Sequence, residues 1–156
     1  MKTLSLTLLC FIITAQSWAC EVTRSDVRRE RQTIIDVWSE HRIDPNLGLA
    51  LAFVESSYRW CARSGHPAYG LFQLTTDAAT DVRGYPVPAW ALFDPKVNAE
   101  IAARWMLYLL AKYSSLEEAL HVYRWGATGY ARGQRDTDYV NRILRYRFEL
   151  NTITMR

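Results

Sequence analysis

An unbroken run of apolar residues and glycine, LGLALAFV, occupies positions 47–54 and is followed directly by Glu55 and two serines. Asp44-Pro45 stands just before the run and supplies an N-cap and a first-turn proline, so we predict a helix over about 45–58. A helix that is apolar on nearly every side is buried on most sides. The segment therefore predicts a central helix that carries a single carboxylate near its end.

Glu55 in such surroundings is expected to be partly desolvated. Burial disfavours the charged form of a carboxyl group, so its pKa rises and the group can act as a general acid near neutral pH. Two structural alternatives compete with this interpretation. Glu55 either lies at the solvent end of the helix or pairs with an arginine such as Arg59 or Arg104, and the pattern alone leaves all three open.

The rest of the chain has helical periodicity and hardly any strand pattern. Helices are predicted over about 25–41, 75–82, 94–113, 115–126 and 136–150, with Ser25, Asp94 and Ser115 as N-caps. The stretch GYPVPAW at 84–90 is expected to be non-helical. Short, closely spaced helices in a chain of 156 residues predict one mostly-α domain.

The first 19 residues have the pattern of an export signal. Lys2 precedes an apolar run of about 12 residues, and Ser17-Trp18-Ala19 places small residues where a signal peptidase reads. We therefore expect a signal peptide at 1–19, a mature domain at 20–156 and export to the periplasm or out of the cell. The alternatives are an uncleaved membrane anchor and a lipoprotein acylated at Cys20, although Ser17 stands where lipoprotein signals usually carry leucine.

Removal of this signal would leave two cysteines, Cys20 and Cys61. Two cysteines in an exported chain favour one disulfide, which would tie the mature N-terminus to the loop after Glu55. The alternative is a lipidated Cys20 together with a free, buried Cys61.

Charge and histidine spacing exclude several other classes of function. The formal net charge of +3 is too small to indicate nucleic-acid binding. His41, His66 and His121 lack metal-ligand spacing, and the sequence contains no phosphate-binding loop and no Ser/His/Asp arrangement. We expect no metal, no cofactor and no nucleic acid.

Four motifs, in order, resemble those of the lytic transglycosylases, which are relatives of goose-type lysozyme. They are AFVESSY at 52–58, ARS with AYGLFQ at 62–73, DPKVN at 94–98 and ALHVYRWG at 119–126, followed by Tyr139-Val140 in the last predicted helix. The resemblance covers about 42–145. It implies a lysozyme-like (α+β) fold, mostly α with at most a small β element near 69–74. It also implies cleavage of the β-1,4 bond between N-acetylmuramic acid and N-acetylglucosamine in peptidoglycan.

The resemblance also implies roles for individual residues. Glu55 would be the catalytic acid and base, and the substrate would be bound by Ser64, Phe72, Gln73, Tyr123 and Tyr139. Phe72 replaces the family's Met and would keep an apolar wall. Tyr123 would point its hydroxyl toward Glu55 or the substrate acetamido group. Beside Tyr123, Trp125 is the best candidate for a ring that stacks on a sugar, with packing as the alternative.

Two departures from the family pattern stand out. Arg124 occupies the place of the family's Asn, which puts that substrate contact in doubt. The segment from Asp136 to Val140 is one residue shorter than the family's Glu-Thr-x-x-Tyr-Val, so Asp136 is not assigned the role of that Glu.

A second carboxylate is the usual requirement for glycoside cleavage. The candidates are Asp77, Asp81 and Asp94, of which Asp94 is better explained as a helix cap and the other two as solvated residues. The resembled family needs no second carboxylate, because the muramyl C6 hydroxyl is the nucleophile and a 1,6-anhydro end is formed.

Three functions therefore remain as hypotheses: a lytic transglycosylase, a hydrolytic muramidase of the lysozyme or endolysin kind that uses Asp77 or Asp81, and a non-catalytic wall-binding assembly module. The expected partner is the glycan strand of peptidoglycan, and a monomer is expected. A secretion, conjugation or pilus machine, a phage and wall turnover all fit as biological settings.

Overall fold

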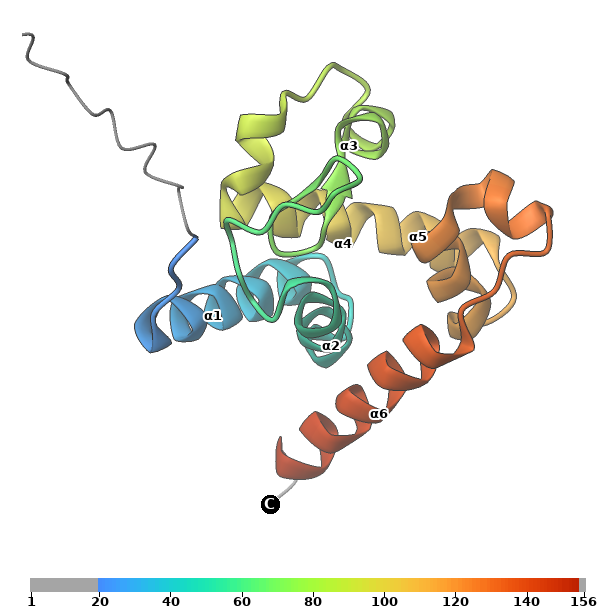
Figure 1. Ribbon diagram of the computed structural model, residues 1–156. Helices are drawn as coiled ribbons and strands as arrows, with labels where there is room; N and C mark the ends of the chain where they lie inside the picture. The colour runs from blue at the N-terminus through green and yellow to red at the C-terminus, as the bar shows by residue number, and fades with distance from the viewer. Residues whose placement is uncertain (1–19, 155–156) are drawn as a thin grey trace, which may run out of the picture.

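The computed structural model describes residues 20–154, so the expected signal peptide at 1–19 lies outside the described residues (Figure 1). The described elements, in chain order, are α1 (Arg24–Glu40), α2 (Pro45–Ser56), β1 (Ala68–Tyr69), β2 (Leu74–Thr75), α3 (Thr76–Arg83), the 3-10 helix η1 (Ala89–Phe93), α4 (Pro95–Lys112), α5 (Leu116–Ala131) and α6 (Thr137–Thr154). None of these helices has both the length and the apolar character needed to cross a membrane.

The mostly-α fold with a small β element is confirmed. Strands β1 and β2 pair antiparallel, with Ala68 opposite Thr75 and Tyr69 opposite Leu74. The N-caps predicted at Asp94 and Ser115 are also present. The prediction that 84–90 is wholly non-helical was wrong at its end, because the 3-10 helix η1 begins at Ala89 directly after Pro88. A proline in that position fixes an extended entry without occupying the helix interior.

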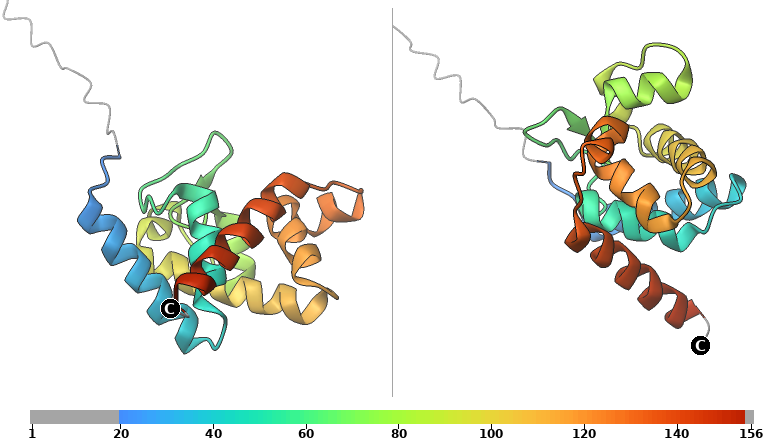
Figure 2. Two further views of the ribbon diagram at one scale, coloured as in Figure 1. Left: turned by 90° about the horizontal axis from the view of Figure 1, so that it is seen from below. Right: turned by 90° about the vertical axis from the view of Figure 1, so that its right-hand side faces the viewer.

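Helix α2 is the centre of the domain, as its apolar run predicts. Helix α2 packs between α1 and α6 (Figure 2). Helix α1 in turn packs against α4. Trp38 of α1 lies against Gly48 of α2, where a Cβ atom would come within 2.5 Å of Trp38 Cδ2. Trp38 also stacks on Phe72 with 5.6 Å between ring centroids. The glycine thus allows a large ring to fill the space between α2 and the β region.

Helix α6 runs antiparallel alongside α2 and is held there by polar contacts near its C-terminal end (Figure 2, left). Arg147 Nε lies 2.6 Å from Asp44 Oδ2, and Asn46 Nδ2 lies 2.6 Å from Asn151 Oδ1. Because Asp44 caps the start of α2, this register brings the first turns of α6 to the last turn of α2. The end of α2 is where Glu55 lies.

A disulfide joins Cys20 to Cys61, with 5.7 Å between the two Cα atoms. It ties the segment before α1 to the loop after α2. In the chain-entropy model, closing a loop of 41 residues lowers the free energy of the folded state relative to the unfolded chain by about 4 kcal/mol.

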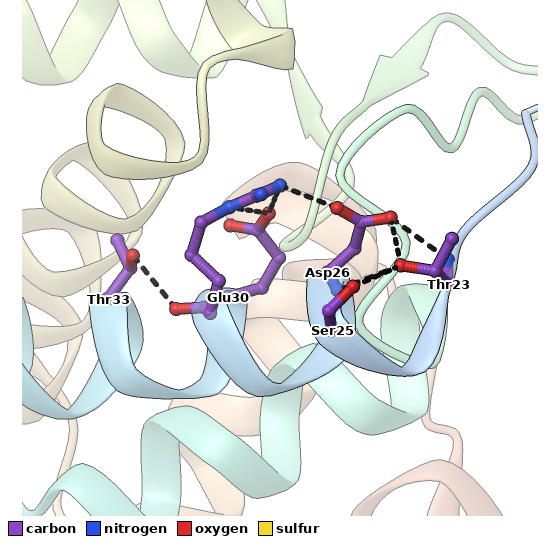
Figure 3. Close-up of polar contacts among 6 residues, drawn as sticks. Thr23, Ser25, Asp26, Glu30 and Thr33 are labelled. Carbon is purple, nitrogen blue, oxygen red and sulfur yellow. Dashed lines mark hydrogen bonds and ion pairs between the residues drawn. The ribbon is translucent and has the colours of Figure 1, made fainter.

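The N-cap of helix α1 lies two residues earlier than predicted. The first turns of α1 also hold a buried carboxylate (Figure 3). Thr23, rather than Ser25, is the N-cap, and it forms a capping box with Asp26. Arg29 bridges Asp26 and Glu30, at 2.9 Å to each carboxylate. The Glu30 side chain is 0% exposed, and its Oε2 has no hydrogen-bond partner within 20–154. Desolvation raises the pKa of Glu30, although Arg29 opposes the shift.

This burial predicts how stability depends on pH. The folded protein holds the Glu30 proton to a higher pH than the unfolded chain does, so the stability that Glu30 contributes is lost as pH rises from about 4 toward 7. Glu30→Gln removes this proton equilibrium. The difference in melting temperature, variant minus wild type, is therefore expected to be more positive at pH 7 than at pH 4. Thermal unfolding at both pH values measures the difference. Glu40→Gln, at an exposed position of the same helix, is the control, and equal differences for the two variants would contradict the prediction.

Candidate active site

Glu55 lies in the last turn of α2, where the helix ends abruptly. Ser57 and Tyr58 follow it in the left-handed region, with φ of 53° and 62°. The Ser57 N–H donates to Phe53 O at 2.9 Å. Left-handed conformations cost non-glycine residues free energy and persist where the surrounding structure imposes them. The turn stops the helix one residue after Glu55, whose side chain keeps partial contact with solvent.

Two helices supply the polar surroundings of Glu55. From α6, the Tyr139 hydroxyl donates to Glu55 Oε1 at 2.5 Å, and Tyr139 itself is only 5% exposed. Desolvation raises the pKa of Glu55, while the Tyr139 hydrogen bond and the charges of Arg124 and Arg142 act in the opposite direction. Burial dominates, so Glu55 holds a proton to a higher pH than an ordinary carboxyl group does. This is the property of a general acid.

Tyr123 of α5 also lies near this carboxylate. Its hydroxyl donates to Phe72 O at 2.9 Å. Burial, and next the negative charge of Glu55, raise the pKa of Tyr123 well above its usual value. Tyr123 therefore stays neutral and links α5 to the loop between the two strands.

The loop from Tyr69 to Gln73 is held by two further side chains. The Ser56 hydroxyl, adjacent to Glu55 in the chain, donates to Leu71 O at 2.7 Å. Asn98 of α4 is fully buried, accepts from Phe72 N at 2.9 Å and donates to Tyr69 O and Leu92 O at 3.0 and 2.8 Å. Since every one of these bonds engages loop or 3-10 backbone, the loop is held at fixed positions beside the end of α2.

Gly70 is required at the centre of this loop. Its φ is 76°, and a Cβ atom there would collide with the Leu92 carbonyl and the Asn98 side chain. The Gly70 N–H donates to Ala62 O at 2.8 Å. Because Gly70 has no Cβ atom, the loop backbone can pass close to Asn98 and η1.

No second carboxylate acts on Glu55 in the described part of the chain. The charged groups that shift its pKa are Arg124 and Arg142. Asp94 is the N-cap of α4. Asp77 and Asp81 lie on α3, which packs against α4 and β2. Within 20–154, no group of three or more His, Cys, Asp or Glu side chains is arranged to hold a metal ion.

Residues 32–142 match the family described as "Transglycosylase SLT domain". The chain belongs to the transglycosylase SLT domain family. The match includes Glu55 and its surroundings on α5 and the first turn of α6, and it excludes Cys20. No curated protein matches the sequence of this SLT domain.

Solved structures of lytic transglycosylases share the fold of this SLT domain. The soluble lytic transglycosylase SLT70 of Escherichia coli matches with a TM-score of 0.61 at 20% identity over 72% of the chain. An inactive variant of Slt from Pseudomonas aeruginosa, in which glutamine replaces a glutamate, matches with a TM-score of 0.65 at 22% identity over 78% of the chain. The matched part covers only 23% and 24% of those longer proteins.

The residues predicted from the sequence fall into two groups in this SLT domain. Glu55, Tyr123 and Tyr139 lie together, although the Tyr123 hydroxyl points to a backbone carbonyl. Phe72 requires a correction. Its side chain is 0% exposed and stacks on Trp38, so it belongs to the core beneath the site and does not form a surface wall. The Phe72 backbone is held by Tyr123 and Asn98.

The other three predicted residues lie around this centre without contacting Glu55 in the described chain. Ser64 is exposed, and its hydroxyl donates to His66 O. Gln73 donates its side-chain amide to Gly70 O at 2.9 Å and to Ala62 O at 3.2 Å. Trp125 is 39% exposed, at the point where α5 breaks at Gly126. Ser64 and Trp125 are thus exposed to solvent.

Three residues near the site, Ser56, Asn98 and Arg142, were missed by the sequence interpretation, which named Arg124 only as a departure from the family pattern. Ser56 and Asn98 were present in the motifs, but their roles in holding the loop require tertiary contacts to be seen. Arg124 and Arg142, which favour the charged form of Glu55, come from two different helices. Helical spacing in α6 places Arg142 three residues after Tyr139, on the same side of the helix, and this was the available signal.

Proposed function

We propose that this SLT domain is a peptidoglycan lytic transglycosylase that cleaves the β-1,4 bond between N-acetylmuramic acid and N-acetylglucosamine and leaves 1,6-anhydromuramic ends. The observation that carries the proposal is the single desolvated Glu55, held by Tyr139, with no other carboxylate acting on it in the described chain. The inactive Glu-to-Gln variant of the P. aeruginosa Slt supports a glutamate as the essential group in that related protein.

In the first half of the proposed reaction, protonated Glu55 acts as the general acid. It transfers its proton to the glycosidic oxygen while the bond from that oxygen to C1 of the muramyl sugar breaks. The raised pKa of Glu55 favours the protonated form that this step needs. The leaving N-acetylglucosamine then carries a free hydroxyl.

In the second half, the carboxylate of Glu55 acts as the base. The C6 hydroxyl oxygen of the same muramyl sugar forms a bond to C1, and its proton passes to Glu55, which returns to its starting state. Because nucleophile and electrophile belong to one sugar ring, the step gains from a high effective concentration. A second carboxylate to activate water is not required.

The proposed substrate contacts surround Glu55. Ser64 and Gln73 would contact the sugar near the cleaved bond, and Trp125 offers a partly exposed ring for stacking on a sugar face. Gln73 already donates to backbone carbonyls, so its carbonyl oxygen is the atom left for the substrate. Tyr123 and Tyr139 would act by positioning the loop backbone and Glu55.

Product analysis tests the proposal. Purified protein is incubated with peptidoglycan sacculi, and the released muropeptides are identified by mass spectrometry. Anhydromuropeptides are the expected products. Products with a reducing muramic acid, each heavier by one water, would indicate the hydrolytic muramidase instead. Binding to sacculi without any release would indicate the non-catalytic assembly module.

Location and partners follow from the same proposal. The signal-like sequence at 1–19 would export the domain to the periplasm, where peptidoglycan is its partner, and the disulfide fits an oxidising compartment. The Cys20 sulfur in that disulfide is not available for a lipid, which favours a soluble periplasmic form over a lipoprotein. A monomer that serves a secretion, conjugation or pilus machine is part of the same proposal.

A further inference from the structure

Arg124 lies on α5, two residues before the break at Gly126. Its guanidinium carbon lies 5.3 Å from the centroid of the Tyr139 ring and 5.5 Å from that of Trp125. Two aromatic faces therefore define the place of the cation, which they attract through their quadrupoles. Its side chain remains 44% exposed. Arg124 is thus a positioned charge beside the site and not a residue of the core.

Asp136 connects this charge to the start of α6. Its Oδ2 lies 3.4 Å from Arg124 Nε. Its Oδ1 accepts from the Tyr139 backbone N–H at 2.9 Å, and its own N–H donates to His121 Nδ1 at 3.2 Å. One carboxylate thus caps α6 at Tyr139 and pairs with the cation over the Tyr139 ring. Arg124, Asp136 and Tyr139 form one connected unit.

The unit ends on Glu55, because the Tyr139 hydroxyl donates to Glu55 Oε1. A cation over a phenol ring strengthens the phenol as a hydrogen-bond donor, and its field also favours the negative form of a nearby carboxyl group. The titratable and charged groups that face Glu55 are Tyr123 and Arg124 from α5 and Tyr139 and Arg142 from α6. The charge of Arg124 lowers the pKa of Glu55, against the larger effect of burial.

We propose that Arg124 is a positioning residue that, together with Asp136, sets the balance between the acid and base forms of Glu55. The inference rests on the proposed function, in which Glu55 must first give up a proton and then take one back. Burial by itself favours only the protonated form of Glu55. A nearby cation is therefore needed to stabilise the charged carboxylate that acts as the base. Asp136 partly neutralises this cation and so weakens the effect of Arg124 on the pKa of Glu55.

The test is whether substitutions of Arg124 and Asp136 shift the titration of Glu55 in opposite directions. Arg124→Gln removes the cation, so the titration midpoint of Glu55 and the alkaline limb of kcat/KM on sacculi are both expected to move to higher pH. Asp136→Asn keeps an oxygen that can cap α6 but frees the charge of Arg124, so both are expected to move to lower pH. Arg124→Lys retains the charge and is expected to stay close to wild type.

The loss of kcat/KM at neutral pH in Arg124→Gln is expected to be smaller than the roughly 10²–10⁴-fold contribution of the acid–base group itself. Arg145→Gln, at an exposed position of α6, is the matched control and should leave both readouts unchanged. Melting temperatures verify that each variant is folded. A purely structural role for Arg124 would lower activity without moving the pH limb.

The Glu55 titration is followed by the carbon-13 NMR shift of its carboxyl group, which requires no turnover. Failure of the proposed function, with no anhydro product from wild type, is therefore distinguishable from failure of this inference. Unchanged Glu55 titration in both Arg124→Gln and Asp136→Asn would overturn the inference. So would shifts of the two variants in the same direction.

Discussion

Replacing Glu55 with glutamine is expected to abolish release of anhydromuropeptides from sacculi, by at least the roughly 10²–10⁴-fold contribution of a general acid–base group. The amide has nearly the same shape and its oxygen can still accept from Tyr139, but it cannot donate a proton to the leaving oxygen. The measurement is the initial rate of product release by the purified variant, with products identified by mass spectrometry.

The fold of this variant should be intact. A carboxyl group whose pKa is raised by burial makes the folded state less stable above that pKa, so the neutral amide should leave the melting temperature at pH 7 unchanged or higher. Glu149→Gln, an exposed change on α6, is the matched control and should retain full activity. Residual release above a hundredth of the wild-type rate in Glu55→Gln would assign the chemistry to another residue. Unaltered biological activity of the variant would favour the non-catalytic assembly module.

Asn98→Ala is expected to lower the free energy of unfolding by about 3 kcal/mol. The change leaves three buried backbone groups without their partner, namely Phe72 N–H and the carbonyls of Tyr69 and Leu92. It also releases the loop that faces Glu55, so activity should fall even at temperatures where the variant is folded. Chemical denaturation measures the stability, and hydrogen exchange at the Phe72 amide measures the local effect.

Asn141→Ala, an exposed change on α6, is the control for Asn98→Ala and should alter stability by less than about 0.5 kcal/mol. A loss below about 1 kcal/mol in Asn98→Ala would mean that water or a rearranged loop satisfies the three groups. Retained protection of the Phe72 amide would contradict the role of Asn98 in holding the loop.

The helices were predictable because their signals are local. Asp44-Pro45 and Asp94-Pro95 start α2 and α4 with a cap and a first-turn proline, and both helices begin where these signals place them. The predicted cap at Ser25 was wrong because three polar residues, Thr23, Ser25 and Asp26, compete within four positions. The reciprocal bonds between Thr23 and Asp26 decide in favour of Thr23.

The site was predictable only in part. Glu55 stood out because a lone carboxylate at the end of an apolar helix has a direct physical consequence, the raised pKa. Phe72 was misplaced because a bulky apolar residue in a motif has the same sequence signature whether it faces a ligand or the core. Its stacking on Trp38, which lies 34 positions earlier in the chain, decided for the core.

The sequence by itself determined the central apolar helix, the carboxylate at its end, the starts of α2 and α4, and the four motifs that resemble one family. These properties depend on neighbouring residues and on helical spacing, which a chain carries in its order. Only the tertiary structure decided that Tyr139 donates to Glu55, that Asn98 and Ser56 hold the loop, and that Arg124 lies between Asp136 and the Tyr139 ring. These contacts join residues that are 15 to 84 positions apart or that meet across helices. They exist because α2, α4, α5 and α6 pack around one core, and that arrangement brings Tyr139, Arg124 and Arg142 to the desolvated Glu55.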